Sequence, residues 1–371
     1  MAFLFSSFYF FYFAIIAIHI IFIPKVLDMV GFSPSEIGII FASAPLVRFI
    51  IPFLFLKGLQ LGRNIFNQAL LLLFISALSF YPALYSFWGL LLANIGLGIG
   101  LSLILPYIEV IALEQIGKER YGKIRLFGSI GFILVALVLV KTLSFPEVAI
   151  YYLVGAVLLT ALFGYSIASQ ELHHTSSSEH NTDSALNIFA HPWLWLGFLL
   201  MQVSFGPFYN FFTIYETDHG ISLDMTIYLW SFGVIIEVLM FYFQGPLLRR
   251  NLLHVIQFTA LATALRWFLV YLYPENLSVL FFTQSLHALS FALFHTAAIS
   301  YLFSLYQDKK LTQQFFFGIA YGLGGFIGAF TSGYIYEFWP EFLFLFAALM
   351  SLMTFGAFLK ASKYQTLRNQ N

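Results

Sequence analysis

The residues of this sequence best suited to chemistry are ionisable side chains that stand inside apolar runs. The clearest is Glu237, within SFGVIIEVLMFYF. A carboxylate among such neighbours must be protonated or paired, because burying it as an isolated charge is very costly. Residues of the same kind, also inside apolar runs, are His19, Arg48, Glu109, Arg266, His287 and His295. A charge in hydrocarbon costs about 3 kcal/mol or more, so each of them is a candidate for function.

Glu237 and Arg266 occupy the middle of two consecutive apolar segments. If these segments are antiparallel helices, the two side chains lie at a similar depth and can pair. Apolar surroundings drive a carboxylate toward its protonated form, and a nearby arginine opposes this. A group balanced in this way can bind and release a proton, as proton coupling requires. The alternative interpretation is a permanent ion pair that fixes helix packing.

His287 and His295 are eight residues apart in QSLHALSFALFH. On a helix this spacing places them about 80° apart, on one broad face. Imidazole titrates near neutral pH and can also hydrogen-bond a solute. Histidine pairs that bind metal on a helix are usually four residues apart, so this spacing does not favour a metal site. The alternative for each histidine is a hydrogen bond to a neighbouring helix.

The sequence leaves two alternative roles for Glu109 and two alternative counter-charges for Arg48. Glu109 comes one turn after Pro106, which loosens a helix, and the basic run RYGKIR follows at residues 120–125. Glu109 therefore either lines a cavity or pairs with this run. Arg48 has no acidic partner in its own segment, and its counter-charge is either Glu109 or a substrate anion.

The composition identifies the kind of protein that must position these residues. The chain has 371 residues, of which 60% are hydrophobic and only 9% charged. Soluble domains carry about 25% charged residues, so this is an integral membrane protein. It has no cysteine and a formal net charge of zero, which excludes disulfides and gives no indication of a nucleic-acid partner. Motifs for phosphate loops, zinc proteases and serine nucleophiles are absent, so we expect neither an enzyme nor a cofactor.

A membrane helix needs about 20 apolar residues, and the chain divides into twelve segments of this kind. The polar, serine-rich stretch 171–189 separates them into six and six. We therefore predict an all-α membrane protein with twelve transmembrane helices in two pseudo-symmetric six-helix bundles, 1–170 and 190–371. His173, His174 and His180 are expected to be solvated linker histidines. The predicted spans are 3–28, 33–57, 64–84, 86–114, 121–141, 146–169, 190–217, 222–248, 251–273, 276–306, 310–337 and 341–361.

The distribution of lysine and arginine sets the predicted orientation. With both termini cytoplasmic, thirteen of these residues fall in inner loops and the tail. The outer loops then hold Lys25 and Lys141 alone. This bias is typical of an inner (plasma) membrane protein with cytoplasmic ends.

The two halves also repeat a pattern. GFSPSEIG precedes Arg48 and GISLDMTI precedes Glu237, and each contains a serine, Ser33 or Ser222, that can cap the following helix. Each serine is 15 positions before the buried charge. The cation of one half therefore corresponds to the anion of the other, both about 22 Å from the outer cap. Two related halves with a site between them are a common transporter plan.

The segment RYGKIRLFGSIGF, residues 120–132, resembles the corresponding loop of proton symporters in the major facilitator superfamily. YLWSFGVIIEV, QSLHALSFALFH and the region through Arg48 extend the similarity to both halves. The nearest likeness is to phenylpropionate permeases, with lactose permeases as more distant relatives. The resemblance implies a twelve-helix fold, alternating access and proton symport.

The resemblance also implies roles for individual residues. Arg125 and Glu109 resemble the sugar-binding arginine and acid of lactose permeases, while Arg266 and His287 resemble their coupling residues. Glu237 matches the acid of phenylpropionate-type proteins. The chain departs from the lactose type at Ser290, where that type has the proton-carrying glutamate, at Phe132, which replaces a stacking tryptophan, and in LKGLQLGRN, which lacks an acid. By elimination, Glu237 inherits the proton-carrying role.

We therefore predict a monomeric secondary transporter that imports a small organic solute, such as an aromatic carboxylate, together with protons. The expected partners are this solute, protons and the lipid bilayer, with no nucleic acid. Three alternatives stay open at this point. They are a sugar or nucleoside symporter, in which Gln202, Asn210 and Gln284 serve hydroxyl groups, a drug/proton antiporter, and a membrane sensor without transport.

Overall fold

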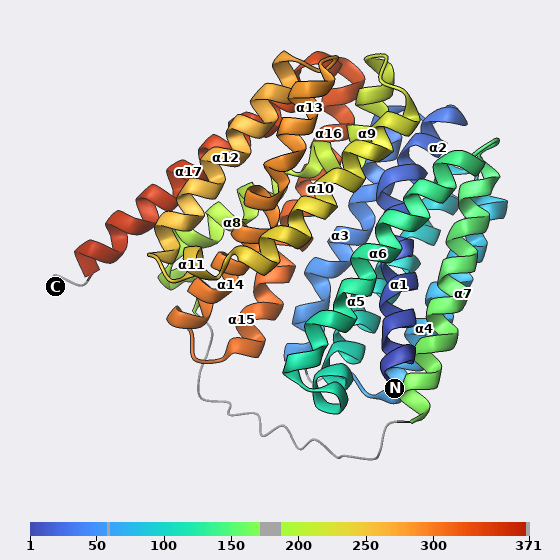
Figure 1. The fold of residues 1–371 in the computed structure, drawn as a ribbon, viewed down its shortest axis with the longest axis horizontal. Coiled ribbons are helices and arrows are strands. Elements are labelled where there is room, and N and C mark those ends of the chain that lie inside the picture. Colours follow the sequence, from blue (N-terminus) through green and yellow to red (C-terminus); the bar gives the residue numbers. More distant parts are fainter. Residues whose placement is uncertain (58–59, 171–186, 369–371) are drawn as a thin grey trace.

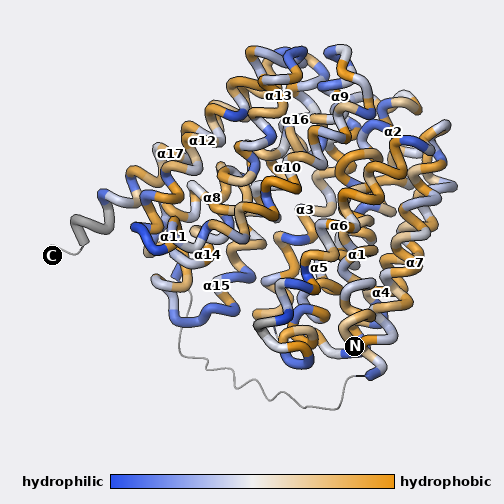
Figure 2. Tube along the Cα trace, in the orientation of Figure 1, coloured by the Kyte–Doolittle hydropathy of each residue, from blue (hydrophilic) through white to orange (hydrophobic). Residues whose placement is uncertain are grey.

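The computed structural model describes residues 1–57, 60–170 and 187–368. The described chain is built from helices, arranged as two groups that lean on one another (Figure 1). Eleven described helices are long and apolar enough to cross a membrane. Apolar residues cover their length and polar residues concentrate at the two ends of the molecule (Figure 2). The predicted fold class is confirmed.

The first group contains the helices before the linker. α1 and α2 form one long rod through a π-helical turn, η1, and the other helices follow singly. α1 packs against α6 and α7, and α5 packs against α3 and α4. The bounds are α1 Ala2–Ala17, η1 Ile18–Phe22, α2 Ile23–Met29, α3 Pro34–Leu56, α4 Arg63–Ala83, α5 Phe87–Ile116, α6 Lys118–Thr142 and α7 Glu147–Ser169.

The second group follows the same plan with more interruptions. α17 packs against α8 and α12, while α10 packs against α13 and η3. The helical bounds are η2 Ile188–Ala190, α8 Pro192–Ser204, α9 Gly206–Asp218, α10 Leu223–Phe243, α11 Gly245–Leu248, α12 Leu252–Leu272, α13 Leu277–Ser285, η3 Ala288–Leu293, α14 Phe294–Leu305, α15 Lys309–Phe316, η4 Phe317–Gly324, α16 Gly325–Phe338, η5 Pro340–Phe342 and α17 Leu343–Arg368.

The predicted spans correspond to these helices, with one difference. The span expected at 190–217 is two helices of 13 residues each, α8 and α9, which meet at Phe205. Pro207 lacks the N–H that would continue the hydrogen-bond ladder. Gly206 also packs so closely on Gly328 that an added Cβ would lie 2.3 Å from its carbonyl carbon. This close tertiary contact accounts for an interruption that hydropathy alone does not predict.

The capping serines of the sequence repeat are confirmed. Ser33 accepts a hydrogen bond from the Glu36 backbone N–H and completes a capping box. Ser222 accepts one from the Met225 N–H. Arg48 and Glu237 therefore occupy equivalent positions on α3 and α10. The domain boundaries at 170 and 190 stay a prediction, because residues 171–186, including His173, His174 and His180, lie outside the described residues.

The two ends of the molecule differ in how the halves meet. We call the end that carries the N-terminus and the start of the linker the linker face, and the opposite end the far face (Figure 1). Toward the far face, α2 packs on α9, α3 on α16 and α6 on α10. A Cβ on Gly333 would lie 2.9 Å from the Gly38 Cα, so glycine permits the α3–α16 contact. The halves are thus closely joined near the far face.

Candidate functional site

A large cavity lies between the two halves. Its volume is about 3220 Å³. Its walls include Leu61 and Gly62 of the α3–α4 connection and Gln307 and Asp308 of the α14–α15 connection, so it extends to the linker face. Among the described residues, none from the far-face connections lines it. The cavity therefore opens toward one side only. The candidate residues from the sequence that line it are His19, Arg48, Glu109, Arg125, Glu237, His287 and His295.

Arg266 lies behind this wall, fully buried, at the centre of a hydrogen-bond network. Its Nη1 contacts His287 Nδ1 at 2.9 Å and Ser290 Oγ at 3.0 Å, and its Nη2 donates to Gln284 Oε1 at 2.9 Å. The guanidinium carbon also lies 4.2 Å from the Trp267 ring centroid. These contacts compensate the cost of burying a cation, since Arg266 has several directional partners and an aromatic face.

The predicted direct contact between Glu237 and Arg266 is wrong. Glu237 Oε2 lies 3.2 Å from His287 Nε2, and His287 separates it from the arginine. A guanidinium can only donate, so His287 Nδ1 accepts from Arg266 and carries no proton. The proton of the neutral ring is then on Nε2, directed at Glu237. The three residues form one relay, and a cationic His287 would lose its contact with Arg266.

Two features of the second half explain why this relay can form. The π-helical turn η3 directly follows His287 and changes the helical register before His295, and such turns are frequent at functional sites. Gly233 on α10 leaves room for Gln284, since an added Cβ would lie 3.3 Å from Gln284 Oε1. Helix α10 can therefore approach the α13–α14 region closely enough for Glu237 to reach the imidazole.

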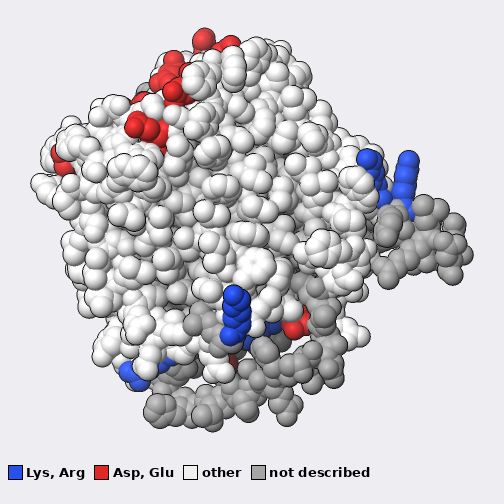
Figure 3. Space-filling model, turned by 180° about the vertical axis from the view of Figure 1, so that it is seen from behind, with Lys and Arg blue, Asp and Glu red and all other residues white. Residues whose placement is uncertain are grey.

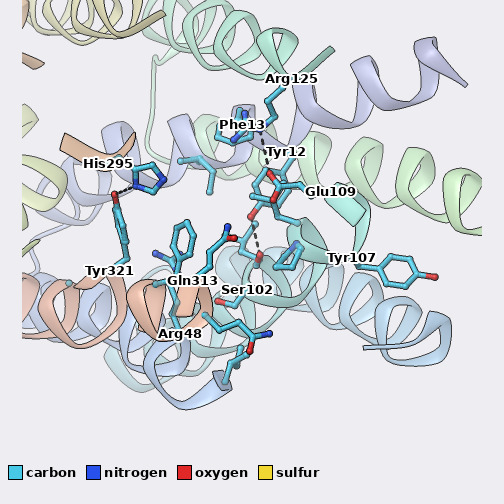
Figure 4. A pocket seen from close by; sticks show the side chains of 18 of the residues that line it. Tyr12, Phe13, Arg48, Ser102, Tyr107, Glu109, Arg125, His295, Gln313 and Tyr321 are labelled. Carbon is cyan, nitrogen blue, oxygen red and sulfur yellow. Dashed lines mark hydrogen bonds and ion pairs between the residues drawn. The ribbon is translucent and has the colours of Figure 1, made fainter. Parts of the chain in front are cut away.

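Arg48 contrasts with Arg266. It lines the cavity, and among the described residues no acidic side chain lies within 4 Å of its guanidinium. Tyr12, Tyr209 and Tyr321 line the same cavity and bring hydroxyl groups to it. Figure 4 shows Arg48 on the cavity wall together with Tyr12 and Tyr321. A cation in such surroundings is suited to an anionic ligand.

Glu109 pairs with the basic run and also lines the cavity, which combines the two roles predicted for it. Arg125 Nε lies 3.6 Å from Glu109 Oε1, and the Tyr121 hydroxyl donates to the same oxygen at 3.1 Å. The Arg125 guanidinium lies over the Phe13 ring at 4.0 Å (Figure 4). Glu109 is therefore engaged by Arg125 and does not serve as the counter-charge of Arg48.

The remaining two histidines differ in their surroundings. His295 Nδ1 lies 2.6 Å from the Tyr321 hydroxyl at the cavity wall (Figure 4). His19 Nε2 lies 2.6 Å from Asn94 Oδ1, and the Asn94 amide donates to the Ile40 carbonyl at 2.6 Å. His19 thus joins three helices through buried hydrogen bonds, and it also lines the cavity. Among the described residues, no group of three or more His, Asp or Glu side chains is arranged to hold a metal.

Sequence reasoning missed several side chains of the site. Tyr209 and Tyr321 are hidden among 21 tyrosines, and no spacing signal distinguishes them. Ser290 was noted only as a missing acid, yet it is a direct partner of Arg266. Glu216, near the end of α9, is fully buried, although its position in the sequence is typical of a solvated helix end.

Comparisons with known proteins agree with this architecture. A model described as the MFS_1 like family matches residues 3–346. The chain is 25% identical over 357 residues to "Probable 3-phenylpropionic acid transporter" of Escherichia coli (strain K12), covering 93% of both chains. It is 27% identical to "Uncharacterized transporter YwbF" of Bacillus subtilis (strain 168), over 71% of this chain and 68% of that relative.

Solved structures give the same result for the fold. A mutant of the nucleoside transporter NupG is similar with a TM-score of 0.81, at 17% identity, over 97% of this chain and 99% of that one. A D-xylose-proton symporter is similar with a TM-score of 0.68, at 14% identity and 95% coverage of both chains. At such low identity these likenesses concern the fold alone.

Proposed function

Since the chain belongs to the MFS_1 like family and is a major facilitator secondary transporter, we propose that it imports a small aromatic carboxylate together with protons. The observation that carries the proposal is Arg48. A cation inside a membrane span is expected to have a partner, and the partly exposed Arg48 has no acidic partner within 4 Å among the described residues. A substrate carboxylate supplies the missing charge in the cavity.

The aromatic part of the substrate is proposed from the aromatic side chains that line the same cavity as Arg48. The cavity wall combines Tyr12, Phe41, Tyr209 and Phe291 with this cation. Aromatic side chains favour stacked or edge contacts with a ring, while the arginine binds a carboxylate in two-pronged geometry. The name of the Escherichia coli relative, a probable 3-phenylpropionic acid transporter, supports the same substrate class.

The proton site is proposed to be Glu237. Its carboxylate lines the cavity and contacts His287, which Arg266 holds in its neutral form. A proton reaching this relay therefore binds Glu237 rather than His287. A protonated Glu237 accepts the Nε2–H less strongly than the carboxylate does, so the contact between α10 and the α13–α14 region weakens. Proton binding and helix packing are linked in this way.

The orientation of the chain is also a proposal. In the view of Figure 3, acidic side chains gather at the far face and basic side chains lie mostly toward the linker face. Cytoplasmic loops of membrane proteins carry an excess of lysine and arginine. We therefore propose that the linker face and both termini are cytoplasmic, in the inner (plasma) membrane of a monomeric carrier, and that the structure is open to the cytoplasm.

Uptake into proteoliposomes tests the substrate class. Labelled 3-phenylpropionate should accumulate when the outside is acidic. An unlabelled aromatic acid should compete, whereas the neutral amide of the same acid and a ring-free fatty acid of similar length should compete weakly. Replacing Arg48 by glutamine removes a charged hydrogen bond worth about 1.5–3 kcal/mol, so the KM should rise about 10- to 100-fold.

The matched control is Arg250→Gln, which removes the same charge at an exposed position outside the cavity. It should leave the KM unchanged. Uptake of sugars or nucleosides with no response to aromatic acids would contradict the proposed substrate. An unchanged KM in Arg48→Gln would show that the carboxylate binds elsewhere.

A further inference from the structure

Glu216 is a buried acid that the central site does not use. Its side chain is fully buried, and neither carboxylate oxygen has a hydrogen-bond partner among the described residues. Within the described residues, no lysine, arginine or histidine nitrogen forms an ion pair with it. An isolated ionised carboxylate in a low-dielectric interior is far more costly than a protonated one. In this conformation Glu216 is therefore neutral and holds a proton.

This proton is separate from the one proposed for Glu237. Glu237 lines the cavity that extends to the linker face, whereas Glu216 does not line it. Glu216 lies two residues before the end of α9, and its carbonyl accepts the Ile221 N–H in the far-face turn. The cavity from the linker face does not reach Glu216, so the carboxylate has no open path to that side. In the present conformation the far face is also closed over this end of α9.

The end of α9 is also where the two halves are held together. Asp218, the last residue of α9, accepts a hydrogen bond from the Tyr336 hydroxyl at 2.6 Å and lies 3.9 Å from Lys25 Nζ of the other half. Two more polar contacts join the halves at this face. They are the Ser35 N–H to Glu337 at 2.9 Å and the Lys141–Asp224 ion pair. Separating the halves at the far face requires breaking the three contacts between them, Lys25–Asp218, Ser35–Glu337 and Lys141–Asp224.

We propose that Glu216 is a proton-binding site that controls opening of the far face. Protonation permits the closed arrangement, and loss of the proton to the medium accompanies opening. Because the site is sealed from the linker side, this proton returns to the side from which it came and is not transported. In the orientation given under the proposed function, on which this step rests, external acidity favours closure independently of the proton that drives uptake.

Other ionisable groups near this end must be considered in any pH response. The elements packed against α9 are α2, α3, α8, α10, α16, α17 and η1. His19 of η1 is bonded to Asn94, and Glu36 of α3 caps its own helix. Within the described chain, α8 and α17 bring no ionisable side chain to the far face. The other ionisable groups that the elements around α9, and α9 itself, bring toward this end are Lys25, Asp28, Asp224, Tyr228, Tyr334, Tyr336, Glu337, Tyr215, Asp218 and His219, and Lys141 of α6 pairs with Asp224.

Of these groups, His219 is the principal alternative to Glu216. Imidazole is the side chain that commonly responds to pH near neutrality, and the His219 Nδ1 lies 2.8 Å from the Tyr215 carbonyl at the end of α9. A pH response of the far face could therefore come from either residue. Separate neutral variants of the two distinguish them.

The absence of cysteine from the sequence allows direct distance measurements. Spin labels at Ser144→Cys and Glu275→Cys, both exposed and on far-face connections of different halves, report opening. In the unliganded full chain, raising the pH should increase the open population by up to about tenfold per pH unit for one linked proton. Glu216→Gln, which mimics the protonated form, should stay closed and lose this response.

Two controls complete the test. His219→Gln and the exposed Glu341→Gln should keep the wild-type pH response. Glu216→Met, a neutral side chain of similar length, should behave like Glu216→Gln and serves if the amide is poorly accommodated. A wild type whose far face ignores pH, or a Glu216→Gln that titrates as wild type does, would overturn the proposal.

Infrared difference spectra give a second measurement. Wild type in the closed form should show the carbonyl band of a protonated carboxylic acid, and Glu216→Gln should lack that contribution. An identical band in both would overturn the proposal. Neither measurement uses a transported solute, so failure of the aromatic-acid proposal would leave this test intact, and the reverse also holds.

Discussion

Replacing Glu237 by glutamine separates proton coupling from substrate movement. The amide oxygen of the new side chain would occupy the place of the Glu237 Oε2, which lies 3.2 Å from His287 Nε2 in the wild type, and it can still accept that hydrogen bond. A charge-assisted bond becomes a neutral one about half as strong, a loss of about 1 kcal/mol. We therefore expect Glu237→Gln to fold with little loss of stability.

Its effect on transport should be much larger. One coupled proton and a gradient of one pH unit supply about 1.4 kcal/mol, enough for about tenfold accumulation of substrate. Without a titrating group at residue 237, this ratio should fall to about one. Exchange of labelled for unlabelled substrate at equal pH needs no net proton movement, so it should continue.

The assay compares both processes in the same proteoliposomes, with uptake under an inward proton gradient and exchange without one. Glu114→Gln is the matched control, because Glu114 is exposed and lines the same cavity close to the linker face. It should accumulate substrate as wild type does. If Glu237→Gln also reaches the wild-type ratio with unchanged pH dependence, Glu237 is a structural residue and the proton binds elsewhere.

Two further predictions concern the surroundings of the relay and the closed face. Arg266→Lys keeps the charge but supplies one compact donor group in place of a planar fork, so it should lose at least one of the three hydrogen bonds. The thermal unfolding temperature, measured with a dye that does not depend on thiols, should therefore fall. A variant as stable as wild type would contradict the hydrogen-bond network. Gly333→Ala places a Cβ 2.9 Å from the Gly38 Cα, which is too close for α3 and α16 to keep their contact. The spin-label pair at residues 144 and 275 should therefore report a larger population with the far face open. An unchanged distance distribution would show that the α3–α16 contact does not hold the far face closed.

Much of the architecture could be predicted because the membrane imposes simple rules. A membrane-spanning helix, whose backbone hydrogen bonds are all internal, must continue for about 20 apolar residues. Apolar runs of this length can be recognised in the sequence. The two N-terminal helix caps could also be predicted, because Ser33 and Ser222 each precede such a run. The interruption at Phe205 was not, because it depends on the close approach of Gly206 to Gly328.

The site was partly legible for a related reason. Glu237 and Arg48 stand out because a charge in an apolar run is rare, but hydropathy does not indicate which partner each charge meets. His287 came between Glu237 and Arg266 because tertiary packing and the π-helical turn η3 set the direction of its ring. Glu216 was not recognised because a carboxylate at a helix end is usually solvated, and only the packing of the surrounding helices shows that it is buried.

The charges around the cavity give a reason for moving an anion and a proton together. Arg266 and Glu237 offset one another through His287, and Arg125 offsets Glu109, which leaves Arg48 as the uncompensated charge among these residues. Under the proposed function, a bound carboxylate neutralises Arg48, and a proton on Glu237 restores the original net charge.

The empty carrier and the fully loaded carrier therefore have the same charge. A carrier loaded with substrate alone, or with a proton alone, differs from them by one charge. Moving one charge through the membrane potential involves about 2.3 kcal/mol per 100 mV. The membrane potential therefore contributes the same energy to the movement of the empty carrier and of the fully loaded carrier. For a carrier loaded with substrate alone, or with a proton alone, this energy differs. Strict coupling can thus arise from the balance of charge in the cavity, without a direct contact between substrate and Glu237.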